Sequence, residues 1–272
     1  MNYDEIYQRN LGLFTKDEQN RLKNAKVAVA GVGGVGSYQA VALARLGVGE
    51  LSIMDPGIFD EPDMNRQYGA LSSTIGINKA EATAPILMDI NPGLKLNIRT
   101  EAADTVAQVD EFIAGAALVI DAIDYAGFRP KQLLHERARK QGMYILSGPI
   151  PGFGASLQIF SPTGMTVEEY YGAPENRGEW DSFRIPITRI APPDAIPQVL
   201  YDFEHEKIAY LSSNGASAQL VGGLLGMEAA LMITGKRLEK DLITVPEMVY
   251  IDLMQREFTV YNPLELVPHS KD

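Results

Sequence analysis

VAVAGVGGVGSYQAVALARLG, from Val27 to Gly47, joins three local signals in one short stretch. Its first residues, Val27 to Ala30, form a β-branched and alanine run that is typical of a buried strand. A glycine-rich turn follows at once, and Tyr38 to Leu46 is apolar at helical spacing until Gly47 ends the helix. Strand, glycine turn and helix are the context in which a G-x-G-x-x-G string indicates nucleotide binding.

The fixed positions of that string are Gly31, Gly33 and Gly36, with Gly34 beside them. The first allows a sharp turn, the second lets a phosphate approach the backbone, and the third lets the helix pack close to the strand. Free N–H groups at the helix start and the helix dipole both favour an anion there. We therefore predict that these four glycines bind phosphates; a glycine turn without a ligand is the alternative.

Length and composition restrict the functional classes. The 272 residues suffice for one large α/β domain or two small ones. A net charge of -11 disfavours a nucleic-acid surface, because phosphate backbones require clustered Lys and Arg; a tRNA substrate is disfavoured but left open. The chain has no cysteine, which removes disulfides, cysteine-ligated zinc and a thiolate nucleophile from it.

No targeting or membrane segment is expected. The first ten residues are polar and charged, unlike a signal peptide. The most apolar window, Ala216 to Thr234, is interrupted by Ser217, Gln219 and Glu228, so we predict a buried core helix. These features predict a cytoplasmic protein with no membrane partner.

Asp55 closes a second predicted strand, Glu50 to Met54. An acidic residue about 20 positions beyond the glycines accepts hydrogen bonds from ribose hydroxyls in such folds. We predict this ribose-binding role for Asp55. The alternative is an aspartate that caps the turn at Pro56-Gly57.

A polar passage from Asp60 to Gly69 follows, with Asn65, Arg66 and Gln67 in succession and no helical or strand periodicity. Polar loops between regular elements often carry function. Lys79 then begins a predicted helix, where the helix dipole disfavours a cation unless a polyphosphate lies nearby. An ordinary exposed lysine is the alternative.

A buried strand predicted at Ala117 to Ile120 runs into Asp121-Ala122-Ile123-Asp124. Both carboxylates are expected on the ligand-binding edge of a parallel sheet. Asp124 is predicted to bind Mg²⁺ beside nucleotide phosphates, or to cap the helix predicted at Phe128 to Lys140. The three histidines, at positions 135, 205 and 269, are scattered and are predicted to be ordinary surface or helix residues.

The alternation of elements predicts a Rossmann-like, doubly wound α/β fold with a mainly parallel sheet, helices on both faces and a C-terminal antiparallel extension. We predict one domain over residues 1–272, with a nucleotide-binding half, 1–160, and a crossover and substrate half, 161–272. Ser161 to Pro197 is proline-rich and too long for an ordinary connector. It is predicted to be a lid, a substrate loop or a docking segment, or else a proline-braced surface excursion.

These pieces together resemble the ubiquitin-activating-type ATP-dependent adenylyltransferases, the ThiF, MoeB and HesA family. The resemblance covers most of the chain. It rests on Tyr7-Gln8-Arg9, GVGGVG at 31–36, Asp55, Asn65-Arg66-Gln67, Lys79, VIDAID ending at Asp124, and the late helix containing GMEA.

The resemblance implies a reaction in which a carboxylate attacks the α-phosphate of MgATP, releasing pyrophosphate and leaving an acyl-adenylate. The carboxylate is usually the C-terminal glycine of a ubiquitin-like protein, such as a sulfur carrier. By similarity, Asp55 holds the ribose, Arg66 and Lys79 bind the phosphates, and Asp124 holds Mg²⁺, with Asn65 and Gln67 among the nucleotide-binding residues. Arg9 would act in the neighbouring subunit, which implies a homodimer.

Two departures from the family stand out. Many relatives carry a catalytic cysteine and two C-x-x-C zinc pairs, and this chain has neither. We therefore expect no zinc and no thioester on this chain, so that its activity stops at the adenylate. A small-molecule or peptide carboxylate is the alternative substrate; an NAD(P)-dependent oxidoreductase and a non-catalytic nucleotide-binding module are the alternative functions.

Overall fold

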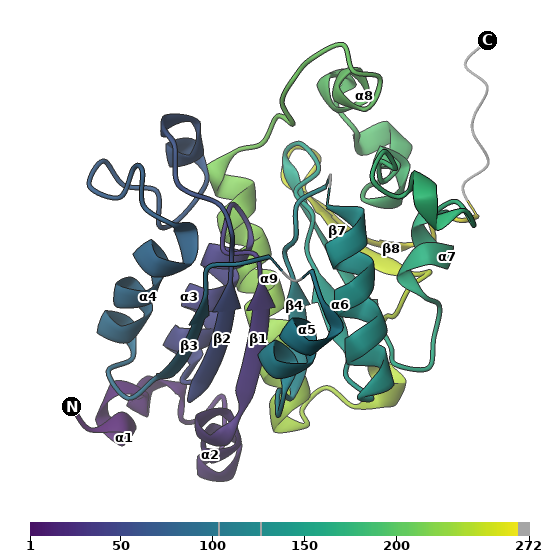
Figure 1. Cartoon of the computed structure of the whole chain (residues 1–272). Helices are drawn as coiled ribbons and strands as arrows, with labels where there is room; N and C mark the ends of the chain where they lie inside the picture. Colours follow the sequence, from purple (N-terminus) through teal and green to yellow (C-terminus); the bar gives the residue numbers. More distant parts are fainter. Residues whose placement is uncertain (103, 126, 266–272) are drawn as a thin grey trace.

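A computed structural model describes residues 1–102, 104–125 and 127–265. At its centre, the described residues form an eight-stranded sheet in the order β3-β2-β1-β4-β5-β6-β7-β8 (Figure 1). The first five strands in this order, β3, β2, β1, β4 and β5, are parallel to one another. Strands β6, β7 and β8 are each antiparallel to their neighbours. The strands are β1 (Lys26–Ala30), β2 (Glu50–Met54), β3 (Lys95–Arg99), β4 (Leu118–Asp121), β5 (Ile145–Ser147), β6 (Gly154–Phe160), β7 (Met248–Asp252) and β8 (Glu257–Tyr261). The predicted fold class is confirmed.

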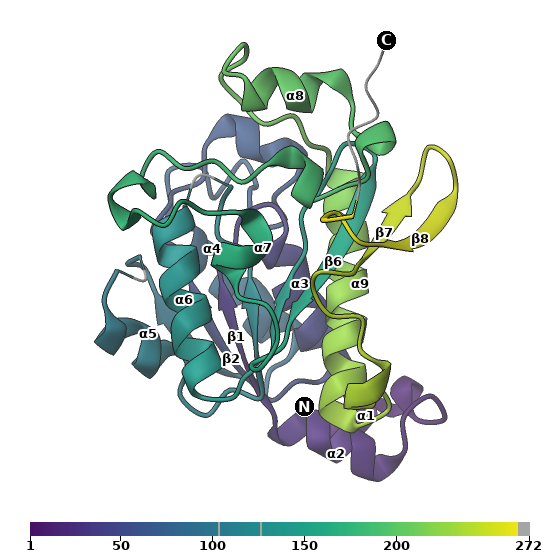
Figure 2. The same cartoon turned by 90° about the vertical axis from the view of Figure 1, so that its right-hand side faces the viewer.

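Helices cover both faces of this sheet and enclose two hydrophobic cores (Figures 1 and 2). One core contains α3, α4 and α9; the other contains α5, α6 and the segment that follows β6. The helices are α1 (Tyr3–Ile6), α2 (Lys16–Asn24), α3 (Gly36–Leu46), α4 (Lys79–Ile90), α5 (Val106–Ile113), α6 (Phe128–Lys140), α7 (Val167–Tyr171), α8 (Gln198–Glu204) and α9 (Gly215–Thr234). The edge strands β3 and β8 remain partly exposed, whereas the central parallel strands are buried along most of their length.

The elements predicted from the sequence lie close to their predicted bounds, but two local predictions were wrong. Residues 61–65 form a short 3-10 helix, η2 (Glu61–Asn65), inside the passage predicted to be irregular. Strand β4 extends one residue further than predicted and includes Asp121, whose side chain is buried. Both differences bear on the site at the carboxyl edge of the sheet.

Helix α9 is, among the described residues, long and apolar enough to cross a membrane by length and composition alone. Half of that window is buried inside the protein, and α9 lies alongside α3 (Figure 2). Glycines make this packing close: a Cβ at Gly222 would lie 2.5 Å from Tyr38 Cβ, and one at Gly226 would lie 2.6 Å from Ala42 Cβ. This packing matches the predicted core helix.

Gly222→Ala is expected to lower the free energy of unfolding by about 1–3 kcal/mol, because the added methyl overpacks the α3–α9 contact. Gly223→Ala is the matched control, since a Cβ there meets nothing within 4 Å. The control should gain up to about 1 kcal/mol through helix propensity. Urea unfolding of both variants measures the difference; equal effects would show that the two helices do not pack this closely.

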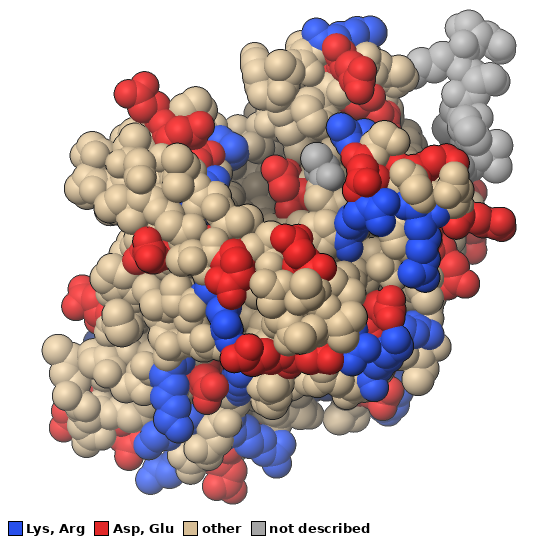
Figure 3. Space-filling view, viewed as in Figure 1, with Lys and Arg blue, Asp and Glu red and all other residues tan. Residues whose placement is uncertain are grey.

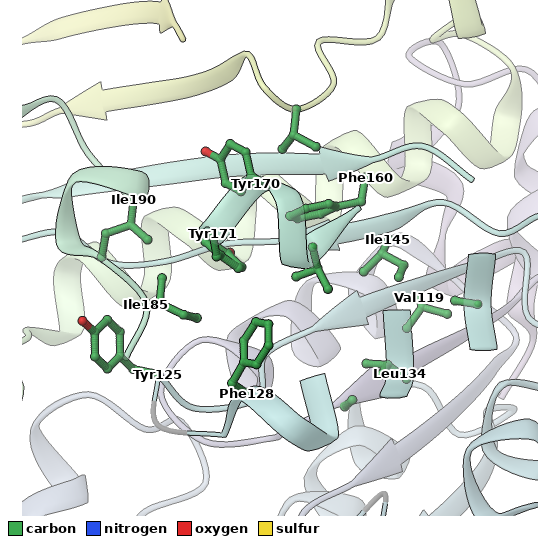
Figure 4. Packing of buried hydrophobic residues seen from close by; sticks show 14 of the residues in the cluster. Val119, Tyr125, Phe128, Leu134, Ile145, Phe160, Tyr170, Tyr171, Ile185 and Ile190 are labelled. Carbon is green, nitrogen blue, oxygen red and sulfur yellow. The ribbon is translucent and has the colours of Figure 1, made fainter. Parts of the chain in front are cut away.

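The proline-rich segment contributes to the second core. It contains α7 and three short 3-10 helices, η3 (Arg177–Glu179), η4 (Ile187–Arg189) and η5 (Pro193–Ala195), and then leads into α8. Its Trp180 packs edge-on against Phe128 of α6, with ring centroids 5.4 Å apart. Ile185 and Ile190 are buried in the same cluster as Tyr125 and Phe128 (Figure 4). The segment is therefore anchored next to the loop that follows β4.

Candidate active site

The glycine turn lies at the carboxyl edge of the parallel strands, between β1 and α3. Gly31 has φ +91°, and a Cβ there would lie 2.3 Å from the Ala122 carbonyl oxygen. A Cβ at Gly36 would lie 1.9 Å from the Gly31 carbonyl oxygen, so both positions require glycine. No side chain caps the start of α3 at Val35. An uncapped helix start suits an anion, although Ser37 N–H already donates to the Gly33 carbonyl oxygen at 3.3 Å.

Asp55 joins the turn to the end of β2. Its Oδ2 accepts a hydrogen bond from Val32 N–H at 2.9 Å, and its Oδ1 accepts one from Gly57 N–H at 2.8 Å. Burial raises the pKa of Asp55; these two bonds and the charge of Lys79 oppose that shift, and the charge of Asp124 adds to it. Asp55 therefore does cap the turn, and the same bonds fix its carboxylate beside the glycines.

Arg66 and Gln67 lie directly against the glycine turn. A Cβ at Gly33 would lie 3.3 Å from Gln67 Oε1, and one at Gly34 would lie 3.8 Å from Arg66 Cγ. Gln67 is buried, and its Oε1 has no hydrogen-bond partner among the described residues. The two residues predicted as nucleotide ligands are thus adjacent to the predicted phosphate turn.

Asp63, which the sequence interpretation missed, holds these side chains together. Its carboxylate accepts hydrogen bonds from Arg66 Nη2 at 3.3 Å and from Gln67 Nε2, and it forms an ion pair with Lys79 Nζ at 3.0 Å. Helical spacing was the available signal, because residues three and four positions apart share one side of a helical turn. Asp63 precedes Arg66 by three residues and Gln67 by four.

Lys79 is the first residue of α4, as predicted. Its Nζ lies 5.6 Å from the centroid of the Phe59 ring, and its Cε lies 3.3 Å from where a Cβ at Gly57 would be. That position places it beside Asp55 as well as Asp63. The structure thus brings the glycines, Asp55, Arg66, Gln67 and Lys79 to one place.

Asp124 is exposed in the loop after β4, and Tyr125 N–H donates to its Oδ1 at 2.6 Å. The cap position of α6 is Gly127, so the alternative of Asp124 as N-cap is wrong. In the described part of the chain, no three His, Cys, Asp or Glu side chains converge on a possible metal position. A single carboxylate facing phosphates still suits Mg²⁺, which takes one or two carboxylates and keeps several waters.

Asp121, expected on the ligand-binding edge beside Asp124, is instead buried beneath it. Its Oδ2 accepts from Lys131 Nζ at 2.6 Å and lies 2.8 Å from His135 Nε2, both on α6. Burial alone would raise the pKa of Asp121, but Lys131 and His135 lower it to about 2. His135 is therefore a buried partner of Asp121 and not an ordinary surface residue. Asp121 Oδ1 also accepts from Ile123 N–H at 3.1 Å, which fixes the loop that carries Asp124.

Lys131→Met should lower the free energy of unfolding by about 3–5 kcal/mol near neutral pH, because it leaves Asp121 charged and poorly compensated. Burial lowers the pKa of His135, and the charge of Lys131 lowers it further. As pH falls through about 6.5, the pKa of histidine in the unfolded chain, wild type therefore loses stability, whereas the variant loses less. In urea unfolding, the difference in the free energy of unfolding between wild type and the variant should become smaller as the pH is lowered.

Lys140→Met, which breaks the exposed pair with Glu136 on the same helix, is the control and should cost at most about 1 kcal/mol. A Lys131 variant as stable as this control would contradict the buried ion pair.

Asn65 adjoins this cluster, whereas Arg9 lies apart from it. Asn65 Oδ1 accepts from Arg66 Nη1 at 2.9 Å, and its Nδ2 donates to the Ser213 carbonyl oxygen at 3.1 Å, so its amide ties Arg66 to the segment that precedes α9. Arg9 lies in the 3-10 helix η1 (Gln8–Asn10), where Tyr7 OH donates to the carbonyl oxygen of Ala44 near the end of α3. The glycine turn is at the other end of α3, about 16 Å away along a helix of this length (Figure 1).

The surface above the carboxyl edge is hollowed, with both basic and acidic atoms on its walls (Figure 3). The hollow lies between the segment that follows β2 and α8 (Figures 1 and 3). Phe203 of α8 packs on Tyr125, with ring centroids 5.6 Å apart, and Tyr125 directly follows Asp124. The proline-rich segment and α8 thus border the candidate site.

The model of the ThiF family matches residues 7–268. This chain belongs to the ThiF family. The family resemblance inferred from the glycine turn, Arg66, Lys79 and Asp124 is therefore confirmed.

The names of the curated proteins that this chain resembles describe different activities. A tRNA threonylcarbamoyladenosine dehydratase of Haemophilus influenzae is 34% identical over 147 residues, which cover 54% of this chain and 56% of that protein. A SAMP-activating enzyme E1 of Haloferax volcanii is 32% identical over 146 residues, covering 54% and 53%. The chain thus spans about half the length of these curated relatives.

A crystal structure of Escherichia coli MccB with ATP has a TM-score of 0.67 at 15% identity. The match covers 90% of this chain and 65% of MccB. At that identity the likeness shows the fold alone, and it agrees with the mainly parallel sheet described above.

Proposed function

We propose that this ThiF-family chain is an ATP-dependent adenylyltransferase that activates a carboxylate. The proposal rests on one observation: Arg66 and Lys79, which come from different elements, both pair with the carboxylate of Asp63, and Arg66 lies against the glycine turn. A dinucleotide, whose phosphates the glycine turn and helix dipole already accommodate, does not require two further cations. A triphosphate that must lose pyrophosphate does require them.

In the proposed reaction, a carboxylate oxygen attacks the α-phosphorus of ATP. The bond from that phosphorus to the oxygen bridging to the β-phosphate breaks, and pyrophosphate leaves. Asp55 orients the ribose, the glycine turn holds the phosphates, and Arg66 and Lys79 offset the charge that accumulates on pyrophosphate. Asp124 would hold Mg²⁺, which when bound neutralises part of the phosphate charge. Because the chain has no cysteine, the acyl-adenylate is the product it releases or passes on.

For the carboxylate, we favour the C-terminal glycine of a ubiquitin-like sulfur-carrier protein. The similarity to a SAMP-activating enzyme supports this choice. A carboxylate carried by tRNA is the second candidate, supported by the similarity to the tRNA threonylcarbamoyladenosine dehydratase. The net charge of -11 speaks against it, because an acidic protein repels a nucleic-acid backbone.

We also propose a homodimer in which Arg9 of one copy reaches the site of the other. The supporting observation is that Arg9 lies at the opposite end of α3 from its own glycine turn, so it could complete only another copy's site.

A ligand-dependent thermal shift tests the proposed cofactor. ATP with Mg²⁺ at about 100 times its Kd should stabilise the fold by about 2.7 kcal/mol, a rise of several degrees in Tm. NAD and NADP at the same concentration should leave the Tm unchanged. A shift with NAD and none with ATP would favour the oxidoreductase; ATP binding without carboxylate-dependent pyrophosphate exchange would favour the non-catalytic module.

A further inference from the structure

Asp63 is a buried anion placed between the two cations of the proposed triphosphate site. Only 8% of its side chain is exposed. Lys79 and Arg66, at 3.0 and 3.3 Å, both lie within ion-pair distance of this one carboxylate. A site built only to attract phosphate would leave these cations unneutralised, so the buried carboxylate requires an explanation.

The backbone fixes Asp63 in this position. Its carbonyl oxygen accepts from Arg66 N–H at 3.1 Å and from Gln67 N–H at 2.9 Å, which closes the turn of η2. Asp60 N–H also points at its Oδ2, at 3.4 Å. The backbone of Asp63 is therefore held in the turn, and the bond from Asp60 N–H to its carboxylate does not involve the cations.

One edge of the Arg66 guanidinium group, at Nε, faces the glycine turn, where a phosphate is expected. Arg66 Nη1 donates to the Pro62 carbonyl oxygen and to Asn65 Oδ1, both at 2.9 Å, and Nη2 donates to Asp63. Its Nε lies 3.9 Å from where a Cβ at Gly34 would be, so this atom lies beside the glycine turn. Asp63 thus orients the guanidinium group of Arg66 and also offsets its positive charge.

We propose that Asp63 is a positioning residue that aligns Arg66 and Lys79 and lowers the net charge of the site, so that pyrophosphate is released. This inference rests on the proposed adenylation. With Asp63 the trio carries a net charge of about +1, and without it about +2. Pyrophosphate concentrates its negative charge on fewer atoms than MgATP. The buried carboxylate of Asp63 therefore weakens the binding of pyrophosphate, the product, more than the binding of MgATP, the substrate. Binding both equally tightly would not help turnover.

Asp63→Asn tests this, because it keeps the shape and one acceptor oxygen but removes the charge. The probes are inorganic pyrophosphate with Mg²⁺ and, separately, MgATP, each titrated by calorimetry, so that no carboxylate substrate is needed. We expect pyrophosphate to bind on the order of tenfold more tightly, MgATP to gain less, and the salt dependence of pyrophosphate binding to steepen. Asp63→Ser should change pyrophosphate affinity in the same direction if the asparagine variant does not fold.

Glu61→Gln is the matched control, since Glu61 is an exposed acid on the same short helix. Its pyrophosphate affinity should stay within about twofold of wild type, because exposed charges are screened. A purely structural role for Asp63 would weaken both ligands and lower the Tm, which would overturn the inference, as would unchanged affinities. If wild type itself binds neither MgATP nor pyrophosphate, the proposed site is wrong and the inference falls with it.

Discussion

Arg66→Ala is expected to lower carboxylate-dependent exchange of labelled pyrophosphate into ATP by about 10³-fold or more. Arg66 lies against Gly34 and is oriented by three separate acceptors, so its removal takes away a prepositioned cation and not a mobile surface charge. The assay needs a cell extract or purified carrier as the source of carboxylate.

Arg45→Ala is the control for this loss, because Arg45 is an exposed arginine near the far end of α3. It should exchange at the wild-type rate. Full exchange by the Arg66 variant would remove Arg66 from the catalytic assignment.

Arg9→Ala and Asp124→Ala should each be inactive, yet their mixture should recover activity. If Arg9 acts in the neighbouring copy, a mixed dimer contains one site with both defects and one site with none. Random exchange of subunits at equal concentration should then restore about a quarter of the wild-type rate.

The same exchange assay measures this complementation after the two variants are mixed and re-equilibrated. Arg9→Ala mixed with itself is the control and should stay inactive. A mixture that remains inactive although mixed dimers have formed would mean that Arg9 does not act across a dimer, and an active Arg9→Ala protein would mean that it does not act at all.

The parallel part of the fold could be predicted because its signals are local. The run from Val27 to Gly47 contains its own strand, turn and helix stop, and the glycines at 31 and 36 are required by contacts that any such turn makes. The strands predicted at Val27 to Ala30, Glu50 to Met54 and Ala117 to Ile120 likewise lie within one residue of their predicted limits, since each is a short apolar run bounded by turn residues.

The buried charges could not be predicted in the same way. Asp63 meets Lys79 across sixteen positions of sequence, and Asp121 meets Lys131 and His135 only because α6 packs beside β4. A lone aspartate near a polar loop or at a strand end looks like a ligand in the sequence. Only tertiary packing shows that one of these carboxylates anchors two cations and that the other lies beneath the loop of Asp124.

The proline-rich segment was hard to predict for a related reason. Trp180, Ile185 and Ile190 are buried without any helical or strand periodicity, because the segment consists of short 3-10 helices joined by irregular stretches. Composition marked the segment as distinctive, but its contact with Tyr125, next to Asp124, depends on the fold.

A crystal structure with Mg²⁺ and a non-hydrolysable ATP analogue tests the proposed reaction site most directly. We expect the triphosphate to lie over the glycine turn, with Arg66 and Lys79 on the β- and γ-phosphates, the ribose at Asp55, and Mg²⁺ between Asp124 and the phosphates. A nucleotide bound elsewhere, or one whose phosphates touch neither Arg66 nor Lys79, would contradict it.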